Sequence, residues 1–121
     1  MKKNFLAVLA FSLLFSLSLP TNSATASDDI ALARQCHQLS ERLSRLSARQ
    51  ADFFCLNKLS MASMIADSVS EYIINHLYEM ADHHLNIVIG SLKYAKAIGC
   101  TNEIEIDSVK DEAIKIKLQI I

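Results

Sequence analysis

The chain has 121 residues, with 12 basic and 13 acidic side chains and therefore a formal net charge of −1. This balance argues against nucleic acid or an anionic membrane surface as the main partner. Only two glycines and one proline are present, and a sheet protein needs more turn residues than that. The composition therefore predicts an all-α protein.

The N-terminal segment is patterned like a secretory signal peptide. Lys2 and Lys3 precede an apolar run over Phe5–Leu19, and small residues follow over Ala24–Ala26. This order of charge, apolar core and small residues is typical of an export signal. The apolar run has about 15 residues, whereas a membrane span needs about 20. We therefore expect a signal peptide over residues 1–26 and export of the remainder to the periplasm.

The remaining segment, 27–121, is long enough for one small domain. Without Lys2 and Lys3 the basic residues number 10 against 13 acidic ones, which gives a net charge of −3. No internal repeat or low-complexity tract divides this segment. We expect a single all-α domain, a small bundle of about four helices.

The first expected helix, over about 28–46, has an apolar face. Apolar residues recur every three or four positions and so share one side of a helix. They are Leu32, Cys36, Leu39, Leu43 and Leu46. Arginines gather on the opposite side, at Arg34, Arg42, Arg45 and Arg49. Such a set is typical of a solvated face or, alternatively, of a rim that meets an acidic partner.

A capping-box pattern marks the next boundary. Ser47 and Gln50 have the Ser-x-x-Gln spacing and precede an apolar run, which predicts a turn and a second helix over about 48–66. Since no glycine or proline forces a break, one unbroken helix over 28–66 is the alternative.

A third helix is expected over about 69–98. Ser68 and Glu71 form a second capping box, and Gly99 is suited to end the helix. The segment is apolar around most of its circumference, which is typical of a helix buried on several sides. Its length would be about 45 Å. We therefore expect either a bend near Gly90 or burial against a second subunit.

The C-terminal part is expected to contain an acidic loop over 101–107 and a fourth helix over about 108–119. Apolar residues fall on two faces of this last helix, which favours a contact with another subunit. We expect a homodimer formed mainly by the third or the fourth helix.

The three cysteines, Cys36, Cys55 and Cys100, all lie in the expected domain. In an oxidising compartment one disulfide is expected, and the odd number leaves one thiol over. In one unbroken helix Cys36 and Cys55 would be about 28 Å apart, whereas a hairpin turning near Ser47 brings them within about one turn. We therefore predict a Cys36–Cys55 disulfide, with Cys100 unpaired or joined across subunits.

No recognisable catalytic motif is present. His76, Glu79 and His83 share a helix side but lack the spacing of a metal site, and no serine or cysteine lies in a known nucleophile motif. We therefore expect a protein that is not an enzyme and holds no cofactor or metal. A polar, acidic edge is the candidate for contact with a partner protein, and its residues are Glu79, Asp82, His83, Glu103 and Glu105.

The plan of the chain resembles a known family. An export signal, a helical domain of about 95 residues, and cysteines in the segments CHQLSERL and ADFFCLNKL are similar to periplasmic immunity proteins of type VI secretion systems. The resemblance is to dimeric helical inhibitors of a lysozyme-like domain fused to a VgrG spike protein. It implies a periplasmic protein that occludes the cleft of a muramidase-like, peptidoglycan-degrading effector. The alternative is a periplasmic helical chaperone or an envelope-stress protein.

Overall fold

The computed structural model describes residues 28–120, and the expected signal peptide lies outside the described residues. The chain divides into two compact units, Met1–Ile30 and Ala31–Ile121, and the packing described below is that of the second. Four helices make up the described residues: an N-terminal helix over 28–48, α2 over Phe53–Ile74, α3 over Tyr78–Ala97 and α4 over Glu103–Ile120. Residues 28–120 contain no strand, so the all-α prediction is confirmed.

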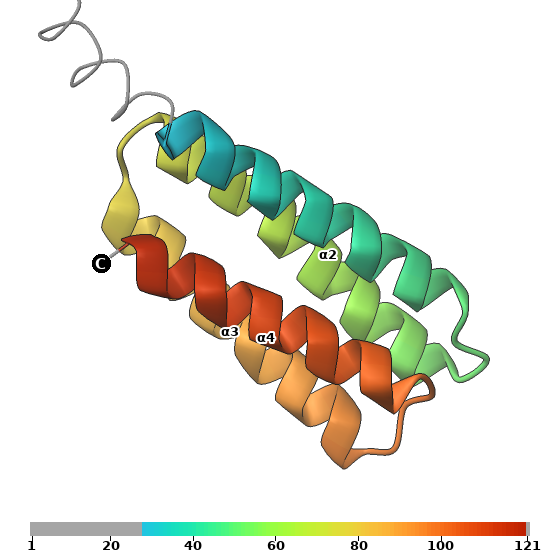
Figure 1. The fold of residues 1–121 in the computed structure, drawn as a ribbon. Helices are drawn as coiled ribbons and strands as arrows, with labels where there is room; N and C mark the ends of the chain where they lie inside the picture. Colours follow the sequence, from blue (N-terminus) through green and yellow to red (C-terminus); the bar gives the residue numbers. More distant parts are fainter. Residues whose placement is uncertain (1–27, 121) are drawn as a thin grey trace, which may run out of the picture. The chain divides into compact units, whose positions relative to one another are not determined.

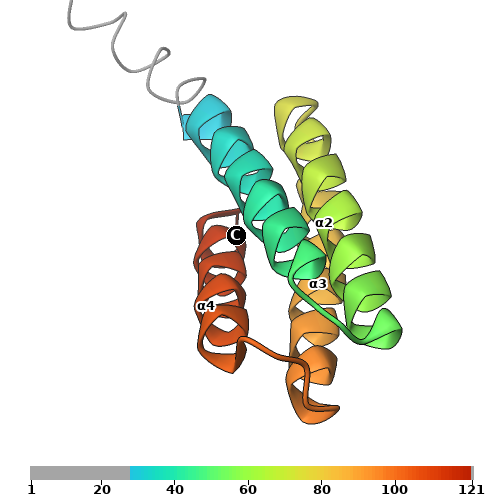
Figure 2. The same cartoon turned by 90° about the vertical axis from the view of Figure 1, so that its right-hand side faces the viewer.

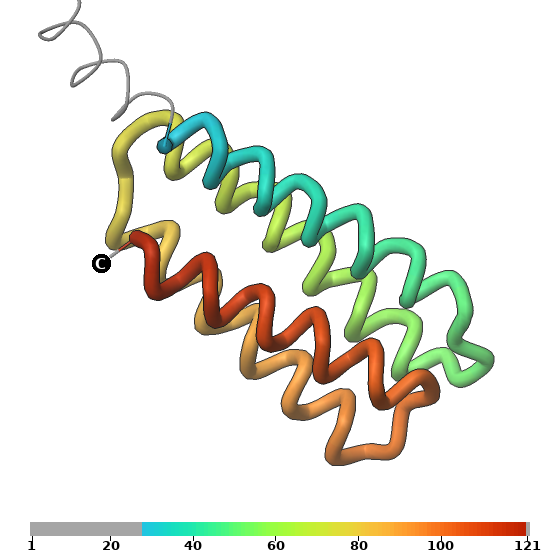
Figure 3. The backbone as a smooth tube through the Cα atoms, viewed as in Figure 1, coloured from blue at the N-terminus to red at the C-terminus, as the bar shows by residue number. Residues whose placement is uncertain are grey.

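Consecutive helices of the second unit run in opposite directions, joined by short turns (Figures 1 and 2). α3 packs against both α2 and α4. The N-terminal helix bonds to α2 through Ser40 and Ser63 and to α4 through an Arg42–Glu112 ion pair. The path of the backbone in Figure 3 shows the same up-and-down order. The architecture is therefore a four-helix bundle.

Periodic apolar residues of all four helices form the core. The predicted face of the N-terminal helix is buried as expected, with Leu39, Leu43 and Leu46 inaccessible to solvent. The other helices contribute the residues Leu59, Ala62, Ala66, Val69, Ile73, Ala81, Leu85, Val88, Leu92, Ala95, Ile106, Val109, Ala113 and Ile116. Because they recur at helical spacing, each helix presents one apolar stripe to the centre.

The turn between the first two helices covers residues 49–52, so the hairpin is correct and the unbroken helix is excluded. The predicted capping box is wrong, because Ser47 belongs to the helix before the turn and its hydroxyl donates to the carbonyl of Leu56. Asp52 caps α2 instead, since its carboxylate accepts from the backbone N–H of Cys55 at 3.0 Å.

The expected third helix over 69–98 is wrong. α2 continues to Ile74, and the chain turns at 75–77, where His76 has a positive φ of 59°. Ser68 lies inside α2 and its hydroxyl donates back to the carbonyl of Ile65. A serine hydroxyl that donates to a carbonyl of the preceding turn has its hydrogen bond inside the helix and does not end it. α2 continues past Ser68 because Val69 and Ile73 are buried and extend the apolar stripe of the helix.

The fourth helix begins earlier than predicted. Residues 103–107 form the first turns of α4, and Ile106 is fully buried. The acidic residues taken for a loop signal lie at a helix N-terminus, where the helix dipole favours negative charge. Gly99 follows α3 with φ +83°, as expected of a glycine that ends a helix.

The disulfide prediction is wrong: Cys55 pairs with Cys100, and Cys36 is free. Hydrogen bonds between Ser40 and Ser63 and between His37 and Asp67 show which residues lie at the same level of the first two helices.

These bonds place the turn about four residues later than Ser47. Cys36 therefore lies level with Asp67 and about 18 Å along the helix axis from Cys55. Cys36 belongs to the core, and burial raises the pKa of its thiol to about 12, which makes it unreactive.

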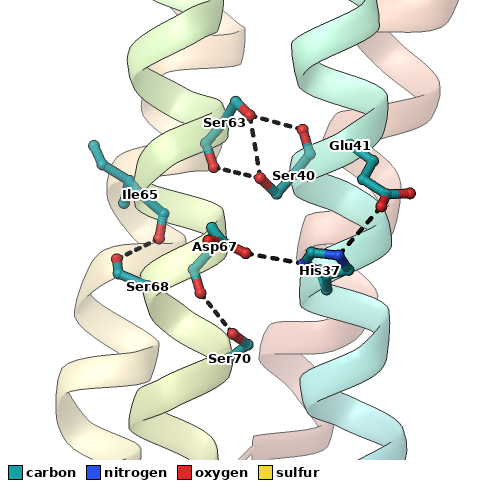
Figure 4. A network of polar contacts seen from close by, with 8 residues as sticks. All are labelled: His37, Ser40, Glu41, Ser63, Ile65, Asp67, Ser68 and Ser70. Atoms are coloured by element: carbon teal, nitrogen blue, oxygen red, sulfur yellow. Dashed lines mark hydrogen bonds and ion pairs between the residues drawn. The ribbon is translucent and has the colours of Figure 1, made fainter.

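A polar network joins the N-terminal helix to α2 (Figure 4). Ser40 donates to the carbonyl of Ser63 at 2.8 Å, and Ser63 donates to the carbonyl of Ser40 at 2.7 Å. These buried hydroxyls are thus fully satisfied. Nearby, His37 lies between Asp67 at 3.0 Å and Glu41 at 3.2 Å. The hydrogen bond to Asp67, followed by the charge of Glu41, raises the pKa of His37.

Two of the N-terminal helix arginines meet acids of this same chain. Arg42 pairs with Glu112, and Arg49 lies 2.9 Å from Glu105. The acidic residues that these two arginines contact belong to α4 of the same chain, and Arg42 is partly buried while Arg49 stays exposed. Arg34 and Arg45 are exposed, as the interpretation as a solvated face predicted.

Candidate functional site

The five predicted contact residues fall into two groups at opposite ends of the bundle. Glu79, Asp82 and His83 lie in the first turns of α3, whereas Glu103 and Glu105 lie in the first turn of α4. α3 has 20 residues and is therefore about 30 Å long. Since α3 and α4 run in opposite directions, one compact contact cannot include both groups.

The two acids of α4 already have partners. Glu103 lies 3.8 Å from Lys96, at the end of α3. Glu105 lies 2.9 Å from Arg49, whose hydrogen bond lowers the pKa of that carboxyl. Glu105 therefore helps to hold the N-terminal helix to α4, and Glu103, the more exposed of the two, is the better placed for an external contact.

The group on α3 is more open. Glu79 and His83 are exposed, and the ring of His83 meets the ring of His84 edge-on at 5.6 Å. One carboxylate oxygen of Asp82, Oδ1, is buried without a hydrogen-bond partner among residues 28–120. Tyr78 and Glu79 line a small hollow beside it.

Among residues 28–120 no three His, Cys, Asp or Glu side chains are grouped to bind a metal. The ring of His76 bonds through Nδ1 to the hydroxyl of Tyr78 at 2.9 Å. His37 bonds through both ring nitrogens to carboxylates. It cannot at the same time accept a proton from a serine, as a catalytic triad requires.

The end of the bundle where α2 begins contains the disulfide of the described residues. There the Cys55–Cys100 disulfide joins the first turn of α2, directly after the turn over 49–52, to the loop over 98–102. We call this end, residues 49–55 and 98–104, the clamped tip. Figures 1 and 2 show the two connections at the same end of the bundle.

Gln50 joins the two loops of the clamped tip a second time. Its side-chain oxygen accepts from the backbone N–H of Thr101 at 3.1 Å and from the Thr101 hydroxyl at 2.9 Å. Its amide nitrogen donates to the carbonyls of Thr101 at 3.1 Å and Leu46 at 3.2 Å. Because Gln50 is buried and all these bonds are made inside the protein, the two loops have one defined arrangement.

The clamped tip exposes large apolar side chains. Ile104 is 88% exposed, Phe53 76% and Phe54 67%. Phe54 also lines a hollow with Tyr94 and Ile98, next to the disulfide. Exposed aromatic and aliphatic side chains on a rigid support are typical of the anchors of a protein interface.

Sequence reasoning missed these anchors. The available signal was that Phe53 and Phe54 come directly before the apolar positions Cys55 and Leu59 but lie off their periodicity. Ile104 was interpreted as part of a loop. Without the helix boundaries, none of these residues could be assigned to the surface.

Comparison with protein-family models, with curated proteins and with solved structures gave no match. Within residues 28–120, none of the helices has the length and hydropathy to cross a membrane.

Proposed function

We propose that this protein is an exported, non-catalytic inhibitor, a periplasmic immunity protein that blocks a muramidase-like secreted effector of a type VI secretion system. The clamped tip enters the substrate cleft of the effector. The observation that carries the proposal is the exposure of Phe53, Phe54 and Ile104 in the first turns of α2 and α4, next to the disulfide and to Gln50.

Rigidity is the physical reason for choosing this end. A loop that is already ordered loses little conformational entropy on binding, so more of the contact energy appears as affinity. The disulfide connects the first turn of α2 to the loop before α4, and such bonds persist in oxidising compartments such as the periplasm. The clamped tip thus combines the stability and the apolar anchors that an inhibitor needs.

Charge supports the same choice. Glu103 lies next to Ile104 at the clamped tip, and the segment 27–121 has a net charge of −3. Clefts that bind peptidoglycan are often basic around their rim, so an acidic inhibitor is favoured in the encounter and in the final complex. Glu103 therefore remains the acidic contact in this proposal, while Glu105 supports it through Arg49.

The test has two steps. The purified protein is immobilised and exposed to envelope extract and to secreted muramidases, and release of soluble peptidoglycan fragments is then measured with and without it. We expect one stoichiometric hydrolase partner and loss of its activity. Ile104→Arg should weaken inhibition by about tenfold or more, because a desolvated anchor typically contributes about 2 kcal/mol or more.

Leu118→Arg is the matched control. Leu118 is also an exposed aliphatic residue of α4, but it lies near the opposite end of that helix. The Leu118→Arg variant should inhibit the hydrolase as strongly as the wild type does. Equal inhibition by both variants would place the contact outside the clamped tip, and absence of any bound hydrolase would refute the immunity function.

A periplasmic chaperone is the second candidate. Exposed Met61 and Met64 on the outer side of α2 favour it, because flexible methionine surfaces bind varied apolar clients. In that case the protein should suppress the aggregation of an unfolded client. Met64→Lys should lower this suppression and Ile104→Arg should leave it unchanged, a result that would support the chaperone over the inhibitor.

A further inference from the structure

The hollow beside the disulfide at the clamped tip has walls from two helices. Its volume is about 400 Å³, and ligand pockets typically measure about 300–1,000 Å³. Phe54 lines it from the first turn of α2, and Tyr94 and Ile98 line it from the end of α3. All three side chains are at least 43% exposed. The hollow is therefore open to a group that arrives from outside.

A carboxylate without a cationic partner lies at this hollow. Asp52 lines it and is exposed. One of its oxygens, Oδ1, caps α2 by accepting from the backbone N–H of Cys55 at 3.0 Å. Among residues 28–120, no lysine, arginine or histidine forms an ion pair with Asp52. Its negative charge is thus left for a group outside this chain.

The end of α3 contributes hydrogen-bond acceptors. Ile98 and Gly99 line the hollow, and the last carbonyls of a helix have no partner within that helix. The backbone N–H groups of Gly99 and Cys100 bond to carbonyls of the preceding turn, but none in residues 28–120 bonds to the carbonyls of Ala97 and Ile98. The negative end of the helix dipole lies here as well. This side of the hollow therefore favours a cation that carries several N–H groups.

The aromatic rings favour the same kind of group. The ammonium of Lys58 lies over the ring of Tyr94, 4.9 Å from its centroid, and Lys58 does not line the hollow. The ring of Phe54 has no aromatic or cationic partner among residues 28–120. A planar guanidinium stacks well on an aromatic face. Phe54 is therefore the ring that remains for a cation from a partner.

We propose that this hollow is the receptor for an arginine side chain of a partner protein. The aliphatic stem packs against Ile98, and the guanidinium lies on the ring of Phe54. Its N–H groups donate to the carboxylate of Asp52 and to the carbonyls at the end of α3. A guanidinium has five N–H donors in one plane, so it reaches both kinds of acceptor at once, which the single ammonium of a lysine does not.

The disulfide fixes the two sides of this receptor. Cys55 follows Phe54 in α2, and Cys100 follows the residues of the hollow that come from the end of α3. Because the walls are covalently joined before the arginine arrives, little ordering is needed on binding. Assigning the arginine to the basic rim of the hydrolase cleft rests on the proposed function. Recognition of arginine by the hollow is a property of this chain and is measured without any hydrolase.

Titration of the purified protein with N-acetyl-arginine amide, followed through the backbone amide signals in heteronuclear NMR, tests the hollow. The signals of Phe54 and Gly99 should shift, with a dissociation constant of about 1–10 mM, as suits a ligand of this size. N-acetyl-citrulline amide has nearly the same shape without the charge. It should bind about tenfold more weakly, because charged hydrogen bonds are about twice as strong as neutral ones.

Three variants locate the contact. Asp52→Asn should weaken binding of the arginine probe about fivefold or more, and it should unfold like the wild type, since asparagine caps a helix about as well as aspartate. Asp111→Asn removes an exposed carboxylate of α4 outside the hollow and should bind as the wild type does. Lys58→Met uncovers the ring of Tyr94 and removes a positive charge, so it should bind the probe more tightly.

Equal binding of the arginine and citrulline probes, or unchanged binding by Asp52→Asn, overturns the inference. Weaker binding by Lys58→Met overturns the role of the aromatic walls. Where a hydrolase is captured and inhibited, Asp52→Asn should also inhibit it less strongly than Asp111→Asn does, and equal inhibition overturns the assignment of the arginine to the cleft rim. Binding of the arginine probe in a protein that captures no hydrolase supports the receptor and refutes the immunity function.

Discussion

Replacing both cysteines of the disulfide by serine should lower the free energy of unfolding by about 4 kcal/mol. The Cys55–Cys100 bond has a sequence separation of 45 residues. For a loop of that length, the loss of chain entropy in the unfolded state is about 13 cal/mol/K, or about 4 kcal/mol at 25 °C. Since single domains are stable by about 5–15 kcal/mol, this bond accounts for a large part of the total.

The assay is urea unfolding followed by far-ultraviolet circular dichroism. Each transition is extrapolated to zero denaturant. The double variant should stay helical at low temperature, because the buried stripes of all four helices are unchanged. Its clamped tip should be looser, so we also expect weaker inhibition of a bound hydrolase than the change in stability alone explains.

A matched variant keeps the disulfide and removes the free thiol. Cys36→Ala truncates a core side chain by one atom and should leave the Cys55–Cys100 peptide intact in non-reducing peptide mapping. Two results would refute the reasoning. One is a disulfide that contains Cys36, and the other is a double-serine variant within about 1 kcal/mol of the wild type.

Two further predictions concern polar groups that join the helices. Because the pKa of His37 is raised from its ordinary value of 6.5 by its bond to Asp67, its stabilising contribution is complete below about pH 6.5 and is lost as the pH rises through the raised value. The wild type should therefore lose more stability than His37→Gln between pH 5.5 and pH 8.5 in urea unfolding (roughly one unit below and two above the ordinary histidine value), and parallel curves would contradict this. Gln50→Leu leaves the N–H and hydroxyl of Thr101 without their acceptor and should lower the free energy of unfolding by about 1–3 kcal/mol. The exposed control Gln38→Leu should change it by less than about 0.5 kcal/mol.

The sequence determined the all-α class and the apolar face of the N-terminal helix. Leu39, Leu43 and Leu46 recur at helical spacing and are all buried, because a stripe of this kind has no other stable position in water. The hairpin after the first helix and the left-handed glycine at Gly99 were also predictable. These features depend on residues close together in the chain.

Tertiary structure alone decided the disulfide, the end of α2 and the start of α3. A shift of a few residues in the position of a turn moves every residue of one helix relative to its neighbour, and this changed the partner of Cys55 from Cys36 to Cys100. Ser68 and Glu71 match a capping box, yet they lie inside α2, because the buried stripe continues past them. A local pattern cannot outweigh the burial of Val69 and Ile73.

The clamped tip also required the fold. Gln50 and Thr101 are 51 positions apart, and only the packing of the four helices brings them into contact. The sequence contained the anchors Phe53 and Ile104, but their exposure depends on which side of each helix faces the core. Helical spacing determines which residues share a side, whereas contacts between distant segments determine which side is left for a partner.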